Sequence, residues 1–517
     1  MKRLLCLVLS LLLITGILPL AAAQGNPVTL KVSIFDRGNT TNTYGTVTDN
    51  YWTKWVQKEF GDPNGITVEY VPIPRSEEAA KLNTLMASNS APDIIFSYDT
   101  KMLMNFGKNG GLTELTDLLK EYAPNVLENL AASLPFGTYM GQQFAVPAVR
   151  AKTGRYANFI RKDWLDQMGY ELKKNDDGFY HMSVEDLQTL LYKAKGTDAA
   201  GMELFPLGMA GAYNASQAKP IIFAFVNRAE LTDEIAATTP QMMWPGFKEG
   251  VRFLNKLYND KIIDPDFMID TDSSLPSLNT QVSTGSTLAF GQDDFYKNGI
   301  VSLYENKPDA DMAVFQLDNV NGEQVIPSYL PVGMYVAIPA SSQNAEAAAK
   351  YLNFLADLDT CKTLSYGIEG VNYSMVDGIP AAIQYTDEQK ATVEGYERIT
   401  CGDMILLYNG QPFGYKSSTL NLSDAEARYT LLYDEAITLS KVGGVPDYYF
   451  QGIVTEAEEK YDGFLQDLEI SLPQLISCPA AEFDTLYDKT INDYLSQGGQ
   501  EIIDDKVELY RQLEAKK

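Results

Sequence analysis

The residue types that most enzymes use for acid–base or nucleophilic chemistry are scarce in this chain. One histidine, His181, occurs among the 517 residues. A Ser–His–Asp or Cys–His arrangement would have to use it, and a multi-histidine zinc or iron site cannot form. We expect His181 to be an ordinary loop residue, because a helix-start pattern begins at Ser183. The 31 Tyr, 22 Phe and 4 Trp favour binding over turnover.

Motifs for nucleotide or calcium binding are also missing. No glycine-rich phosphate loop stands between a predicted strand and a predicted helix. The nearest match to a calcium loop places Gly178 sixth, but Lys173 then stands first and Val184 twelfth, where oxygen ligands are needed. The sequence therefore predicts no metal and no cofactor. A pair of carboxylates of the glycosidase kind stays possible, because 68 acidic residues make chance pairs uninformative.

The N-terminus has the three parts of a secretory signal peptide. Lys2 and Arg3 precede an apolar run over 4–20, and three alanines end at Ala23. The run is short for a membrane span, which needs about 20 apolar residues. The formal net charge of −27 disfavours nucleic acid and anionic membranes as partners. We expect cleavage after Ala23 and an exported, soluble chain.

Length and cysteine content limit the architecture further. A chain of this length suggests two or more domains. Cys6 lies in the signal peptide, which leaves Cys361, Cys401 and Cys478, and nothing in their spacing selects a disulfide pair.

The first hundred residues predict a parallel sheet. Val28, Leu30, Val32 and Ile34 alternate with polar residues, as in a strand with one buried face. The predicted order is a strand at 28–35, a helix at 51–60 ended by a breaker at 61–65, a strand at 66–70, a helix capped by Ser76, and a strand at 93–96. Ligands of such sheets bind beyond the carboxyl ends of the strands. The residues just past those ends are Asp36, Arg37, Ser97, Tyr98 and Asp99.

The remaining chain predicts a second α/β block and a helical end. Strands are expected at 157–160, 205–211, 287–291 and 332–339, with helices at 162–165, 245–258 and 345–355. The last third is mostly helical, and its apolar stripe over 483–495 is assigned to the core.

Three segments resemble the extracellular solute-binding proteins of bacterial ABC importers, in particular the long branch typified by lipoproteins and alginate-oligosaccharide-binding proteins. They are Ala91-Pro92-Asp93-Ile94-Ile95-Phe96, Ile160-Arg161-Lys162-Asp163-Trp164-Leu165-Asp166-Gln167-Met168-Gly169 and Tyr366-Gly367-Ile368-Glu369-Gly370-Val371-Asn372-Tyr373, the last followed by Val376-Asp377-Gly378-Ile379-Pro380. The resemblance covers nearly the whole mature chain.

The resemblance implies a periplasmic-binding-protein-like fold of two α/β lobes, joined by a hinge and followed by a helical C-terminal extension. Segments 24–148 and 291–332 would form the first lobe. Segments 149–290 and 333–517 would form the second, with the tail packed on it. Ligand would sit between the lobes and draw them together.

The resemblance and the chemistry of sugars together nominate binding residues. Sugar rings need flat aromatics for their apolar faces and planar polar groups for their hydroxyls. The nominated residues are Asp36, Arg37, Tyr98, Asp99, Arg150, Trp164, Tyr213, Asn214, Trp244, Asp293, Asp294, Tyr366, Glu369 and Tyr373.

Three of the nominated residues have a structural alternative. Trp164 could pack the start of its helix onto the lobe, Glu369 could cap a helix or bind backbone amides, and Asp99 could cap the next helix. The chain also departs from the family in two places. Gln24 stands where many relatives carry a lipidated Cys, and the stretch over 196–201 offers only Asp198 as a calcium ligand.

Three functions remain open at this point. The first is a receptor, expected to be monomeric and periplasmic or extracellular without a lipid anchor. It would capture a small solute, with an oligosaccharide favoured, and deliver it to membrane permease subunits. The second is a secreted carbohydrate-active enzyme that uses two cleft carboxylates. The third is an adhesin or sensor with the same fold. The sequence does not name the ligand.

Overall fold

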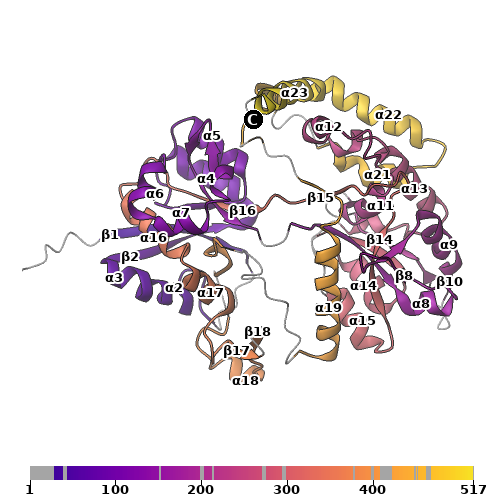
Figure 1. The fold of residues 1–517 in the computed structure, drawn as a ribbon, viewed down its shortest axis with the longest axis horizontal. Coiled ribbons are helices and arrows are strands. Elements are labelled where there is room, and N and C mark those ends of the chain that lie inside the picture. The colour runs from indigo at the N-terminus through magenta and orange to yellow at the C-terminus, as the bar shows by residue number, and fades with distance from the viewer. Residues whose placement is uncertain are drawn as a thin grey trace, which may run out of the picture.

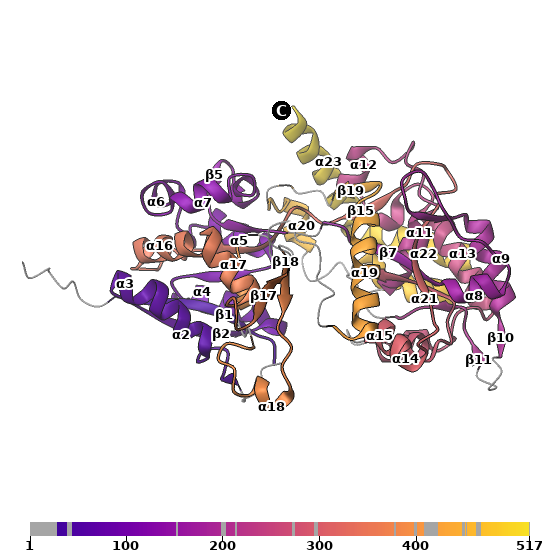
Figure 2. The ribbon, with the colours of Figure 1, turned by 60° about the horizontal axis from the view of Figure 1, so that its bottom comes forward.

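The chain folds into two α/β lobes with a helical C-terminal extension (Figures 1 and 2), which confirms the predicted architecture. The computed structural model describes residues 28–38, 44–150, 153–197, 203–211, 215–270, 275–293, 298–376, 379–397, 401–407, 422–446, 450, 452–461 and 467–515. The predicted signal peptide lies outside these residues.

The first lobe is built on strands whose apolar faces alternate as the sequence predicts. Strands β1 (Val28–Asp36) and β2 (Ile66–Pro74) pair in parallel along their whole length. Strand β3 (Ile95–Ser97) pairs with β16 (Val332–Ala337), which also pairs with β6 (Val146–Val149). A parallel bridge from Val32 to Ile94 places β3 beside β1. The carboxyl ends of β1, β2 and β3 therefore meet at one edge.

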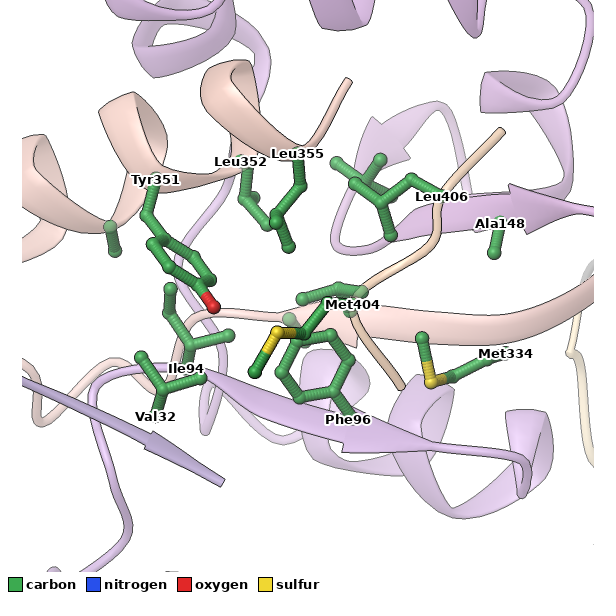
Figure 3. Close-up of a cluster of buried hydrophobic side chains, with 14 of the residues drawn as sticks. Val32, Ile94, Phe96, Ala148, Met334, Tyr351, Leu352, Leu355, Met404 and Leu406 are labelled. Carbon is green, nitrogen blue, oxygen red and sulfur yellow. The ribbon is translucent and has the colours of Figure 1, made fainter. Parts of the chain in front are cut away.

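Helices cover the first lobe and close its core. They are α2 (Tyr51–Val56), α3 (Asp62–Asn64), α4 (Glu78–Ala87), α5 (Thr100–Lys108), α6 (Thr116–Tyr122), α7 (Pro124–Asn129), α16 (Ala345–Leu355), α17 (Leu358–Tyr366) and α18 (Asp387–Lys390), with a hairpin of β17 (Tyr373–Val376) and β18 (Ile379–Ala382) and a smaller one of β4 (Thr138–Tyr139) and β5 (Gln142–Gln143). Figure 3 shows Val32, Phe96, Met334, Tyr351 and Met404 in one buried cluster. This core thus combines segments more than 300 residues apart.

The second lobe surrounds a six-stranded mixed sheet. Its order is β12 (Leu207–Gly208), β13 (Ala289–Asp293), β7 (Tyr156–Arg161), β14 (Met312–Leu317), β9 (Tyr180–Met182) and β8 (Lys173–Lys174). Both faces of β7 are buried, because Tyr156 and Ile160 belong to one apolar core and Ala157 and Phe159 to another. Helices α8 (Lys162–Gln167), α9 (Val184–Ala194), α11 (Lys219–Phe223), α12 (Asp233–Thr238), α13 (Phe247–Asn259), α14 (Pro276–Thr284), α15 (Asn298–Asn306) and α19 (Asp424–Leu439) surround the sheet.

The described residues of the C-terminal extension form four α-helices. They are α20 (Glu456–Tyr461), α21 (Leu472–Ser477), α22 (Phe483–Tyr494) and α23 (Gln500–Glu514). Helices α21 and α22 pack on α13 of the second lobe, while α23 lies along the upper side of the molecule in Figure 1. A short parallel pair of β15 (Ile326–Ser328) and β19 (Gly444–Pro446) lies near the point where the chain passes between the lobes.

Two segments belong to the opposite lobes from those predicted. Strands β13 and β14 flank β7 antiparallel, so most of 291–332 lies in the second lobe. Strand β16 pairs with β3 and β6, and residues 332–407 contribute to the first core. The prediction was wrong because the sequence shows where strands occur but not which strands they pair with. The chain therefore crosses after β6, after β15 and between Leu407 and α19.

Local details also differ from expectation. Helix α4 begins at Glu78, and Ser76 lies in the 3₁₀ turn before it, so Ser76 is not its cap. The helix from Tyr51 continues through a π turn and α3 to Gly65, whose φ of +65° ends it. His181 lies in β9 rather than in a loop. Its Nδ1 is 2.7 Å from Asp318 and its Nε2 is 2.9 Å from Asp177.

Candidate ligand-binding site

Aromatic and cationic side chains meet where β1, β2 and β3 end. The rings of Phe35 and Tyr98 stack with centroids 5.6 Å apart. The Arg75 guanidinium lies 4.6 Å from the Tyr98 ring and 5.3 Å from the Phe35 ring, and Arg37 lies 5.5 Å from Phe35. Strand β1 begins on the outer side of its lobe, so this end faces the second lobe (Figure 1). The predicted meeting of these strand ends is therefore observed.

A polar cavity of about 520 Å³ opens beside this stack. It is lined by Arg75, Ser76, Glu78, Ala79, Tyr98, Asp99, Thr100 and Lys101. The buried Glu78 carboxylate accepts hydrogen bonds from the Ser97 hydroxyl and the Tyr98 amide and pairs with Arg75 at 2.7 Å. These bonds hold the Arg75 guanidinium over the Tyr98 ring. Burial raises the pKa of Tyr98, so its hydroxyl stays protonated.

Arg37 is fixed by a partner that is distant in sequence. Its two Nη atoms donate to the Asp403 carboxylate at 2.7 and 2.6 Å. Asp403 is fully buried in the 3₁₀ turn at Cys401–Asp403, and its hydrogen bonds raise the pKa of Arg37. The sequence offered no signal for Asp403, because the contact spans 366 residues. The ion pair orients Arg37 at the edge of the site.

The two nominated aspartates at this edge have local roles. Asp36 is exposed and accepts a hydrogen bond from the Gly38 amide at 2.9 Å. Asp99 caps α5 by accepting from the Met102 amide at 2.9 Å, which is the structural alternative for this residue. Asp99 also lines the cavity, so capping does not remove it from the site.

A second cavity, of about 550 Å³, lies at the β17–β18 hairpin. It is lined by Tyr366, Asn372, Tyr373, Pro380, Ala382, Ile383, Gln384, Tyr396 and Glu397. The Tyr366 and Tyr373 rings lie 5.8 Å apart. The exposed Glu369 does not line this cavity, and its backbone bridges to Tyr373. The hairpin extends below the first lobe in Figure 1.

Arg150 lies at the crossing between the lobes. Its guanidinium is 4.2 Å from the Tyr329 ring, and its Nε donates to the Val332 carbonyl at 3.3 Å. Arg155 also contacts Tyr329, at 4.9 Å. Arg150 and Arg155 both contact Tyr329, so they join the segment between β6 and β7 to the segment between β15 and β16.

Two nominated tryptophans are structural. Trp244 is only 6% exposed, lies 6.3 Å from Phe223 and donates from Nε1 to the Thr239 carbonyl. Trp164 packs on the second core beneath Arg161, 5.1 Å away, at the end of β7 opposite the crossing. The structure therefore places both in packing contacts of the second lobe, away from Tyr98. Tyr213, Asn214 and Asp294 lie outside the described residues, and Asp293 ends β13 opposite Tyr156.

Sequence reasoning missed three polar side chains in the second lobe. Asn158 Oδ1, Ser216 Oγ and Gln217 Oε1 are buried without a hydrogen-bond partner among the residues that the structure describes, and each residue is at most 6% exposed. They lie near the carboxyl end of β13, because Gly291 pairs with Asn158 and lies under the Gln217 carbonyl. Buried polar atoms normally have partners. The signal in the sequence was an asparagine inside the apolar strand 157–160.

The described residues contain no group of three or more His, Cys, Asp or Glu that could hold a metal ion. Cys361, Cys401 and Cys478 are buried, and they form no disulfide within the described parts of the chain. Within the described parts of the chain, no helix has the length and apolar character needed to cross a membrane.

Comparisons with known proteins agree with this architecture. Lipoprotein LipO of Bacillus subtilis is 24% identical over 62% of this chain, and the polygalacturonan/rhamnogalacturonan-binding protein YtcQ of the same organism is 23% identical over 58%. The matches span 64% and 60% of those relatives' own lengths. The substrate-binding protein FusA of Streptococcus pneumoniae in complex with kestose superposes with a TM-score of 0.66 at 18% identity, covering 95% of this chain and all of FusA. The model of the bacterial extracellular solute-binding protein family matches residues 44–359, and the chain belongs to this family.

Proposed function

We propose that this protein is the receptor of an ABC importer and captures an oligosaccharide between its lobes. The observation that carries the proposal is the partly exposed Tyr98 ring, which packs on the buried Phe35 and lies under Arg75, together with buried amide oxygens of the second lobe that have no partner among the described residues. An aromatic ring suits the apolar face of a sugar, and amide oxygens suit its hydroxyls. The printed names of YtcQ and of the FusA complex support a carbohydrate ligand.

The first experiment is a search for the ligand. Purified protein is titrated with neutral and acidic oligosaccharides in a thermal-shift assay, followed by calorimetry of those that raise Tm. We expect at least one oligosaccharide to stabilise the protein and to be recovered intact. If none binds, the receptor proposal fails. Release of shorter products would instead favour the enzyme that uses two cleft carboxylates.

A pair of tyrosine variants tests the first-lobe stack. Tyr98→Ala should weaken binding roughly ten-fold, because it removes the ring that stacks on the ligand. Tyr192→Ala is the matched control, since Lys256 lies 4.7 Å over that ring on the outer side of the second lobe. Equal effects of the two variants would contradict the assignment of Tyr98.

Ser216→Ala tests whether the buried Ser216 hydroxyl of the second lobe binds the ligand. The variant deletes a buried hydroxyl that has no partner in the described part of the chain, so the ligand-free protein should keep or gain stability. Binding of the oligosaccharide should become weaker, because the hydroxyl is then missing from the complex. Lower stability with unchanged affinity would show that the hydroxyl serves the fold instead.

The proposal also covers delivery of the ligand to a permease and the place where the protein works. We propose that the mature protein is a monomer, works outside the cytoplasmic membrane and carries no lipid. A strain without the gene should lose uptake of the oligosaccharide that the purified protein binds. Mass spectrometry of the mature protein tests for a lipid anchor, and a diacylglyceryl group would refute a free receptor. The similar protein LipO is named a lipoprotein.

A further inference from the structure

We propose that α20 and α23 form a strap that ties the two lobes together and restrains their separation. The strap is residues 452–461 together with α23. It contacts α5 of the first lobe at one end and α12 of the second lobe at the other. Helix α20 lies between the lobes in Figure 2, and α23 runs above them in Figure 1. The sequence predicted a tail packed on the second lobe alone.

The contact with the first lobe is made by two ion pairs and a close approach. Lys101 Nζ lies 2.8 Å from Glu458 and Lys108 Nζ lies 2.7 Å from Glu459. The two lysines are seven residues apart, so they share a face of α5. Gly452, with a φ of +65°, lies against the Met104 side chain, where a Cβ would collide.

The strap is held together by its own polar contacts. Lys506 of α23 lies 3.1 Å from the Glu458 carboxylate, which therefore receives one lysine from the first lobe and one from α23. The Ala457 amide donates to Asp505 at 2.9 Å, and Lys460 pairs with Glu501 at 2.7 Å. Helices α20 and α23 consequently form one unit.

The second lobe holds the other end. Arg511 donates two hydrogen bonds to Glu234 of α12, each 3.0 Å long. Further along the tail, Asn255 of α13 donates to the Cys478 carbonyl at 2.7 Å, which fixes α21. A strap anchored on both lobes must break its weaker end when the lobes move apart.

Helix α23 packs along α12 at the second-lobe end, whereas the contact with α5 is made mainly by ion pairs, so the α5 end is the weaker one. Ion pairs between mobile bodies lose strength as salt screens them. The Glu458 side chain is only 10% exposed, so its pairs are screened less than those of Glu459. Lys101 also lines the cavity beside Tyr98, so Glu458 of the strap pairs with a residue of the proposed binding site. Opening of the lobes is thus linked to Glu458.

The test measures the distance between the lobes without any ligand. Spin labels are placed at exposed positions by Lys81→Cys on α4 and Lys173→Cys on β8, and pulsed electron resonance gives the distance distribution. Glu458→Gln keeps the size of the side chain and removes its charge. The population with longer distances should rise roughly five-fold, as expected for loss of a charge-assisted contact. About 1 M salt should widen the wild-type distribution in the same direction.

Asp484→Asn is the matched control. Asp484 also bridges two cations, Lys248 at 3.2 Å and Arg252 at 2.5 Å, but both belong to the second lobe. The Asp484→Asn variant should leave the distance distribution unchanged. Lys108→Glu should widen the distribution, and adding Glu459→Lys should restore it. An unchanged distribution in Glu458→Gln, or equal widening in Asp484→Asn, would overturn the strap.

Discussion

The Arg37–Asp403 ion pair yields an asymmetric prediction. Asp403 is fully buried, whereas 38% of the Arg37 side chain is exposed. Arg37→Ala leaves a buried carboxylate without its cation, and such a loss costs about 3–5 kcal/mol. We take the lower end, about 3 kcal/mol, because solvent reaches the edge of the pair. Asp403→Asn leaves a guanidinium that water can reach, so it should cost only about 1–2 kcal/mol.

The positions of the four tryptophans allow unfolding of the first lobe to be measured separately by fluorescence. Trp52 and Trp55 lie in the first lobe, and Trp164 and Trp244 in the second. In a background with Trp164→Phe and Trp244→Phe, fluorescence during urea unfolding reports on the first lobe. Arg37→Ala should lower the urea midpoint more than Asp403→Asn does, at an unchanged slope.

A double-mutant cycle completes this test. The variant with both changes should lose less than the two single variants together, because the buried charge and its partner disappear at once. Equal losses in the two single variants, or additive losses in the cycle, would refute the claim that burial of Asp403 dominates this contact.

Three further predictions follow from single sites. Burial lowers the pKa of His181, but its bonds to Asp318 and Asp177 outweigh this and raise the pKa overall. The stability that His181 contributes should be full below about pH 6.5 and should fall as the pH rises through the raised value, which urea unfolding of His181→Gln against wild type measures. Gly291→Ala should lower Tm, because a Cβ there meets the Gln217 carbonyl. Gly333→Ala is the control, because a Cβ there meets only the Arg150 guanidinium, at the ordinary contact distance of 3.8 Å. Attraction by two lysines lowers the pKa of Glu458 to about 2 despite burial, so its stabilising effect should persist from neutral pH down to about pH 4 and be lost only on further acidification.

Much of the first lobe could be predicted because its signals are local. The alternation over 28–35 defined β1, and the strand ends at Arg37 and Tyr98 meet as the parallel order requires. Arg75 was missed, although it follows β2 in the same way, because the predicted strand ended at 70 while β2 continues to Pro74.

The errors in the candidate site have a common physical origin. An aromatic residue has the same local signature whether its ring faces a ligand or a core. Trp244 belongs to the second core, and Trp164 packs on it from the end of the lobe away from the crossing. Burial separates Trp244 from Tyr98, and the position of its helix in the lobe separates Trp164 from Tyr98. Conversely, Asn158 is polar within an apolar strand, and its lack of a partner becomes visible only when its surroundings are known.

The exchange of segments between the lobes changes how the site is assembled. The first lobe needs β16 and residues up to Leu407 for its core, and Asp403 of that returning segment fixes Arg37 at the end of β1. The site is therefore completed only after the chain has built most of the second lobe and come back. Because Lys101 of the cavity is held by Glu458 of the strap, the tail also takes part in this edge. Contacts that shape one face of the proposed site thus come from three distant parts of the chain. A change in any of them should alter the affinity for the ligand.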